Sequence, residues 1–107
     1  MKAVNVELKD SDGECLVKVK IPGFDARDID IQVSGSHLVI EGKHESTGEK
    51  KSKEGKIVER KFEQIYRAIE LPAPVSAEKG HAELKNGVLE LKLPKAERPK
   101  QIKIAAA

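Results

Sequence analysis

The sequence is poor in cysteine, in aromatic residues and in long apolar runs. Among 107 residues it has one cysteine, no tryptophan, two phenylalanines and one tyrosine. A single cysteine excludes an internal disulfide and fits a reducing compartment. No apolar run approaches the roughly 20 residues that a membrane-spanning helix needs, and the first residues carry no signal-peptide pattern. We therefore expect a cytoplasmic protein without stable membrane association.

The charge of the chain is nearly balanced but unevenly distributed. The net charge is +2, and residues 43–61 carry 7 Lys/Arg against 4 Asp/Glu. Proteins that bind single-stranded nucleic acid need aromatic side chains on which bases stack. Phe24, Phe62 and Tyr66 are too few and too scattered for that purpose. We therefore interpret the basic segments as solvated surface and expect no nucleic-acid partner.

Residues that could carry catalysis form no recognisable constellation. His37, His44 and His81 show none of the spacings typical of a metal site, and we interpret them as surface residues. The chain has no phosphate-cradling glycine-rich loop and no nucleophile elbow. Cys15 falls on an apolar face near a turn, where a small half-buried side chain is expected. We predict a binding protein that is not an enzyme and uses no cofactor or metal.

Apolar residues alternate with polar ones in several short segments, which is typical of strands with one buried face. Two-residue turns separate three pairs of these segments: Asp12-Gly13, Gly35-Ser36 and Asn86-Gly87. Counting outward from the turns predicts these facing pairs: Val4 with Ile21, Val6 with Val19, Leu8 with Val17, Ile31 with Ile40, Val33 with Leu38, Ala82 with Leu91 and Leu84 with Leu89. The chain is therefore predicted to form an antiparallel immunoglobulin-like β-sandwich of seven to eight strands.

Two segments depart from this pattern. Residues 43–56 have no apolar periodicity, and we interpret them as a long polar loop, which in a compact domain is usually functional or disordered. The charged segment 57–62 is a short strand candidate. In the next strand Arg67 shares the parity of the apolar residues, as expected for a charge at a sheet edge that reaches water. After Lys95 the alternation stops, and a basic linker leads to Ile102-Lys103-Ile104.

The assembled segments resemble the α-crystallin domain of the small heat shock proteins over nearly the whole chain. The block from Ala82 to Leu89, which contains Asn86-Gly87-Val88-Leu89, is highly specific. Ile102-x-Ile104 is similar to the C-terminal motif of the family and stands at the expected place. The remaining carriers are Val17-Lys18-Val19-Lys20-Ile21-Pro22-Gly23-Phe24, Leu38-Val39-Ile40-Glu41-Gly42, Glu59-Arg60 with Ile65-x-Arg67-x-Ile69-x-Leu71-Pro72, and Leu93-Pro94-Lys95.

The resemblance implies an ATP-independent holdase that binds unfolding proteins and prevents their aggregation. Residues 1–95 would form the α-crystallin domain and residues 96–107 a flexible C-terminal extension. The resemblance also implies that partners exchange residues 43–61 to form a homodimer, which can assemble further through the C-terminal motif. In the family a long hydrophobic N-terminal arm precedes the first strand. Met1 stands three residues before Val4 here, so we expect the chain to lack that arm.

Four sets of residues are predicted to carry these interactions. The exchanged strand contains Ile57, Val58, Glu59, Arg60 and Phe62, and its receiving edge on the partner contains Val4, Val6 and Leu8. A groove for the C-terminal motif and for clients is expected between two strand edges that carry Ile29, Ile31, Val33, Ala82 and Leu84. The docking side chains of the motif are Ile102 and Ile104, which point the same way on an extended segment.

Two other classes of protein share a sandwich of this kind. A co-chaperone of the CS-domain type would lack both the exchanged strand and the Ile-x-Ile tail, so residues 43–61 and 102–104 argue against it. An adhesion-like or enzyme-accessory interaction sandwich from outside the cell would more often carry disulfides, which the lone Cys15 disfavours.

Overall fold

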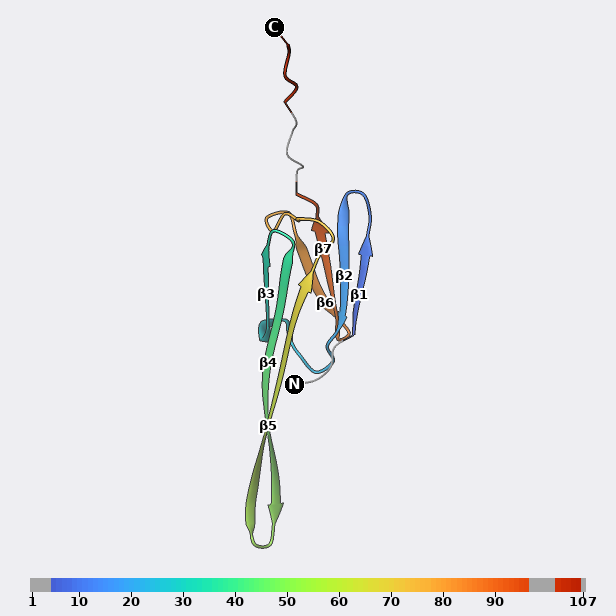
Figure 1. The fold of residues 1–107 in the computed structure, drawn as a ribbon. Helices are drawn as coiled ribbons and strands as arrows, with labels where there is room; N and C mark the ends of the chain where they lie inside the picture. Colours follow the sequence, from blue (N-terminus) through green and yellow to red (C-terminus); the bar gives the residue numbers. More distant parts are fainter. Residues whose placement is uncertain (1–4, 97–101, 107) are drawn as a thin grey trace.

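The fold is described from a computed structural model that places residues 5–96 and 102–106. In these residues two antiparallel sheets pack face to face (Figure 1). The four-stranded sheet has the order β1-β2-β7-β6 and the three-stranded sheet has the order β3-β4-β5. The strands are β1 (Val6–Asp10), β2 (Glu14–Lys20), β3 (Ile29–Ser34), β4 (His37–Ser52), β5 (Gly55–Glu70), β6 (His81–Lys85) and β7 (Val88–Pro94), and a 3-10 turn, η1, spans Ala26–Asp28. The predicted antiparallel sandwich is confirmed.

The three predicted hairpins form with the predicted registers. Val6 pairs with Val19, Val33 with Leu38 and Leu84 with Leu89. Gly35 has a φ of +60°, while Asn86 and Gly87 have φ values of +52° and +76°. These positive values are what a type II′ turn needs at its first central residue and a type I′ turn at both. The predicted pair Val4 with Ile21 lies outside the described residues because the structure does not describe Val4.

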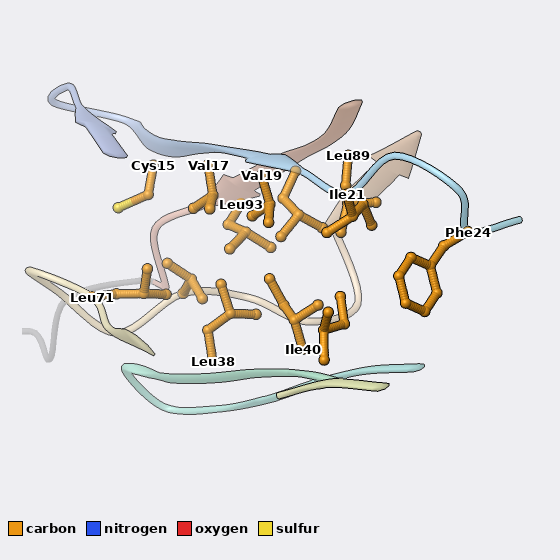
Figure 2. Close-up of a cluster of buried hydrophobic side chains, with 13 residues drawn as sticks. Cys15, Val17, Val19, Ile21, Phe24, Leu38, Ile40, Leu71, Leu89 and Leu93 are labelled. Atoms are coloured by element: carbon orange, nitrogen blue, oxygen red, sulfur yellow. The ribbon is translucent and has the colours of Figure 1, made fainter. Parts of the chain in front are cut away.

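The core lies between the two sheets and consists almost entirely of aliphatic side chains. β2 pairs with β7, which sets Val17 opposite Leu91 and Val19 opposite Leu89. Figure 2 shows Val17 and Val19 pointing toward Leu38 on the facing sheet. The buried residues are Cys15, Val17, Val19, Ile21, Phe24, Leu38, Ile40, Ile65, Leu71, Val75, Leu89, Leu91 and Leu93. Cys15 is thus fully buried rather than half-buried, because it packs on the face shared by β2 and β7.

The predicted polar loop at residues 43–56 is wrong, because these residues extend β4 and turn back into β5. Each strand has 16 residues, and the pairing runs from His37 with Glu70 to Ser52 with Gly55. The predicted short strand 57–62 is therefore part of β5, which continues into the sandwich without a break. The backbone N–H and C=O groups of the two strands are paired with each other, while the side chains face water. Pairing in this segment therefore needs no alternation of apolar and polar residues.

The remaining local prediction concerns Arg67. Arg67 is exposed on β5, an edge strand of its sheet, as expected for a charge that reaches water. Within residues 5–96 and 102–106 there is no helix long and apolar enough to cross a membrane.

Candidate interaction surfaces

The part of the β4–β5 hairpin that projects beyond the sandwich, residues 45–62, is here called the finger (Figure 1). It exposes three large apolar side chains: Ile57 and Val58 are about half exposed, and Phe62 is 61% exposed. All three belong to the predicted exchange strand, together with Glu59 and Arg60. Apolar surface exposed on a projecting hairpin is a feature of surfaces that bind another protein.

The two faces of the finger carry different side chains. Directly paired residues share a face, so Val58 opposite Glu49 and Phe62 opposite Glu45 define one face, which also carries Arg60. Two ion pairs join β4 to β5: Lys50 Nζ lies 3.9 Å from Glu59 Oε1 and Lys56 Nζ lies 2.8 Å from Glu49 Oε1. A third, Lys61 Nζ at 3.3 Å from Glu63 Oε1, lies within β5. Glu59 and Lys61 lie on the other face, together with Ile57.

A small polar cluster holds the root of the finger against the sandwich. His44 Nδ1 lies 2.9 Å from Asp28 Oδ2, and both side chains are mostly buried. The Asp25 backbone N–H donates to the same oxygen at 2.9 Å, and the ring of Phe24 meets the His44 ring edge-on at a centroid distance of 6.1 Å. The Asp25 N–H and then His44 lower the pKa of Asp28 against the opposing effect of burial. The cluster therefore links η1 to β4 where the finger begins.

Sequence reasoning misplaced His44, which we interpreted as a surface histidine in a loop. It shares the parity of Leu38, Ile40 and Gly42 on β4, so its side chain points toward the inner side of the sandwich. Gly42 is needed just before it, because a Cβ there would lie 2.8 Å from Ile65 Cγ1. The alternation of residues 38–44 was the signal that could have placed His44 correctly.

The predicted receiving edge is β1, the outermost strand of the four-stranded sheet. Val6 is half-buried and Leu8 is 42% exposed, and both face the inner side through their pairing with Val19 and Val17. Glu7 and Lys9 point to the outer face. Val4, the third predicted residue, lies outside the described residues. One side of β1 has no strand beside it among the described residues, so its backbone groups there can accept another strand.

The predicted groove lies between the edge strands β3 and β6. Two neighbouring hollows of about 170 and 110 Å³ occur there, and Ile31 and Ala82 line both. Val33 lines the first, while Ile29 and Leu84 line the second. The structure thus brings all five predicted groove residues together. Sequence reasoning missed further lining residues: Ala26 in η1, Ala77 and Gly80 in the connection before β6, and His81, the first residue of β6.

Gly80 is required at one end of the groove by close packing. A Cβ at this position would lie 3.2 Å from the Ala77 carbonyl oxygen and 3.2 Å from Leu93 Cδ2. With a larger residue at position 80, the chain entering β6 could not lie so close to Leu93 of β7. The glycine therefore shapes this end of the groove, which it also lines.

The side chains of the C-terminal motif are not packed on their own sandwich. Ile102 is 88% exposed and Ile104 is 93% exposed, on a segment without helix or strand structure. Two isoleucines held in water are an unfavourable arrangement unless another surface covers them. In the single chain, therefore, Ile102 and Ile104 do not occupy the groove between β3 and β6.

Comparison with known proteins decides the family. The profile of the Hsp20/alpha crystallin family matches residues 7–106, which is nearly the whole chain. The chain belongs to this family. The resemblance seen in the sequence is thereby confirmed.

Proteins from several organisms are similar to this chain. The spore protein SP21 of Stigmatella aurantiaca is 34% identical over 94% of the chain, and small heat shock protein C2 of Rickettsia felis is 33% identical over 92%. The chain spans 61% and 64% of the length of these two relatives. Heat shock protein 16.0 of Schizosaccharomyces pombe has a similar structure, with a TM-score of 0.69, 29% identity and coverage of 100% of this chain and 99% of that one.

Two further observations concern the polar side chains of this small heat shock protein. Residues 5–96 and 102–106 contain no group of three or more His, Cys, Asp or Glu side chains that could hold a metal. Burial and then the nearby Asp10 carboxylate raise the pKa of the Cys15 thiol, so the group stays protonated at neutral pH. Lys95 Nζ lies 2.8 Å from Asp10 Oδ1, and this ion pair joins the end of β1 to the residue that follows β7.

Proposed function

We propose that this chain is a nucleotide-independent chaperone domain that dimerises by strand exchange and binds unfolding proteins to prevent their aggregation. The small heat shock proteins are non-enzymatic chaperones, and family membership supports this general role. The observation that carries the specific proposal is the finger, which exposes Ile57, Val58 and Phe62 on a paired, projecting hairpin. Burial of these apolar side chains against another subunit would be favourable, because it removes their surface from water.

The dimer forms when the finger of each subunit adds to β1 of its partner. Backbone hydrogen bonds supply part of the affinity, because β1 is an edge strand, and the apolar residues of both strands supply the rest. The exchange is tested by replacing residues 46–61 with Asn-Gly. Since Glu45 pairs with Phe62, a two-residue turn closes the shortened hairpin without disturbing the sandwich. We expect a folded monomer in sedimentation, and a variant that stays dimeric would exclude the exchange.

Residues 96–107 act in this proposal as an extension of a domain formed by residues 1–95. Ile102 and Ile104 dock into the groove between β3 and β6 of a neighbouring subunit and build assemblies larger than a dimer. The two hollows lie side by side along the groove and share Ile31 and Ala82, which suits two side chains that project from one extended segment. Docking is reversible, because the ordering of the extension opposes the gain from burial.

Clients bind to the same groove and compete with the C-terminal motif. The groove is the largely apolar concave surface that the described part of the sandwich leaves open between β3 and β6. The assay is the turbidity of a heat- or reductant-unfolded client at several chaperone ratios, with and without ATP. We expect suppression without nucleotide at high molar ratio, and stronger suppression per subunit after removal of residues 99–107. A requirement for ATP would refute the proposal.

A co-chaperone of the CS-domain type is the alternative function. The mass of the chain in solution distinguishes this alternative from the strand-exchanged dimer. A co-chaperone of this type is expected to be a monomer that lacks an exchanged strand. The finger therefore favours the small heat shock protein arrangement. Sedimentation of the unmodified chain as a monomer at micromolar concentration would favour the alternative.

A further inference from the structure

We propose that two ion pairs between subunits, Glu7 with Lys61 and Lys9 with Glu59, fix the register in which the finger pairs with β1 of a second copy. The proposal rests on the strand exchange proposed above and adds the register and the selectivity of that contact. In this register Phe62 lies opposite Val6 of the partner.

The direction of pairing follows from symmetry. The finger projects beyond one end of the sandwich, so two subunits can exchange fingers only if the fingers point in opposite directions (Figure 1). A two-fold axis perpendicular to the fingers produces this arrangement, and two-fold symmetry is the rule for homodimers. In one subunit β1 and β5 run in the same direction along the long axis (Figure 1). The two-fold axis reverses the partner's β1, so the finger strand and that β1 are antiparallel.

The face of the finger follows from where the apolar residues lie. Val58 and Phe62 share one face of β5 with Arg60, while Glu59 and Lys61 share the other with Ile57. On β1 the residues facing the inner side are Val6 and Leu8. An added strand aligns its faces with those of its neighbour, because side chains alternate strictly. The face of the finger that carries Val58 and Phe62 therefore continues the inner face of β1, and the face that carries Glu59 and Lys61 meets the outer face of β1.

Of this antiparallel register and the two neighbouring registers slipped by two residues, only one matches the charges. With Phe62 opposite Val6, Lys61 lies opposite Glu7 and Glu59 lies opposite Lys9. A slip of two residues in one direction sets Glu59 opposite Glu7. A slip of two in the other sets Lys61 opposite Lys9 and Glu63 opposite Glu7. Like charges directly across a strand pair are destabilising and opposite charges are stabilising, so the slipped registers are disfavoured.

The four charged side chains are accessible for this contact. The side chains of Lys61 and Glu59 are 71% and 64% exposed, and their contacts within the subunit, at 3.3 Å to Glu63 and 3.9 Å to Lys50, lie on the protein surface. Glu7 and Lys9 are exposed on β1, beside a surface hollow of about 430 Å³ that Leu16 also lines. Exposed ion pairs of this kind exchange partners at little cost.

Cysteine cross-linking reads the register directly. Directly opposite residues have Cβ atoms about 4.5–5.5 Å apart and diagonal ones about 7–8 Å, so a disulfide reports only the facing pair. Three full-length double variants combine Val6→Cys with Phe62→Cys, Arg60→Cys or Gln64→Cys. Cys15 is fully buried and does not compete. We expect a covalent dimer under mild oxidation only for Val6→Cys with Phe62→Cys. Preferential cross-linking of either other variant would overturn the register.

Charge reversal tests the ion pairs independently of the cross-link. Glu7→Lys and Lys61→Glu, each alone, should raise the dimer dissociation constant at least about tenfold, because each dimer contains the pair twice. The double variant should return to within about threefold of the unmodified chain. The control combines Glu7→Lys with Lys51→Glu, which reverses an exposed lysine on the β4 side of the finger and should give no recovery.

The outcomes separate this proposal from the exchange on which it rests. If the Asn-Gly replacement of residues 46–61 gives a monomer but the double charge reversal shows no recovery, the register is wrong and the exchange stands. If that replacement leaves the dimer intact, the exchange itself is wrong. Recovery in the double variant, absent in the control, supports both.

Discussion

Truncation of Phe62 should weaken the dimer strongly and leave the subunit intact. Complete burial of a phenylalanine side chain contributes roughly 1.5–3 kcal/mol. Because Phe62 is 61% exposed in the isolated subunit, its burial in the dimer contributes about 1–2 kcal/mol for each finger. Each dimer contains two fingers, so Phe62→Ala should cost ~2–4 kcal/mol of association free energy. The dissociation constant should rise between about 30-fold and several hundredfold.

The measurement is sedimentation velocity over a dilution series, together with chemical unfolding of each variant. Tyr66→Ala is the matched control, because Tyr66 is also an exposed aromatic on the same face of β5 but pairs with Glu41, outside the finger. We expect this control to keep the dissociation constant of the unmodified chain. An unchanged constant for Phe62→Ala would refute the burial of this face against β1. An equal loss for both variants would show that the interface extends over the body of β5.

Three further predictions concern the tail, the core and the root of the finger. Changing Ile102 and Ile104 together to Gly should reduce the mass of any assembly larger than a dimer in light scattering, and an unchanged mass would count against docking. Leu91→Ala should lower the free energy of unfolding by about 2–5 kcal/mol, since Leu91 is fully enclosed by the two sheets, whereas Lys92→Ala should change it by less than about 0.5 kcal/mol. The pKa of Asp28 is lowered in the folded state, so its contribution to stability is present above about pH 4 and is lost as the pH falls further. Urea unfolding between pH 2.5 and 7 should therefore show a shallower acid-side loss for Asp28→Asn, and identical slopes would contradict the role of the cluster.

Local sequence signals predicted the hairpins because two independent signals agreed in each. The turn Asn86-Gly87 needs positive φ values, and the alternation around it places Leu84 opposite Leu89 only when those two residues form the turn. A slip of one residue would have turned the apolar face of β6 outward. Such agreement fixes the register without any knowledge of the rest of the chain.

Other features could not be predicted, because no local signal specifies them. The pairing of β2 with β7 joins residues more than 60 positions apart and depends on how the sheets pack. The finger escaped prediction because its side chains face water on both sides and its strands are held by backbone pairing and ion pairs such as Lys56 with Glu49. The five residues predicted from the edges of β3 and β6 line two hollows between these strands, but Gly80, which precedes β6, and His81, its first residue, were missed because neither belongs to the apolar alternation of β6.

The order of the strands implies that the two proposed interactions of the chain do not obstruct each other. β1 and β6 are the opposite edges of the four-stranded sheet, so a finger added to β1 lies across the sheet from the groove that β6 forms with β3. Replacing Phe62 should therefore leave docking of Ile102 and Ile104 unchanged, and the reverse should also hold, because residues without shared contacts have additive effects. The free-energy losses of the combined variant should equal the sum of the separate losses. Strong non-additivity would show that the finger and the C-terminal motif meet on one surface.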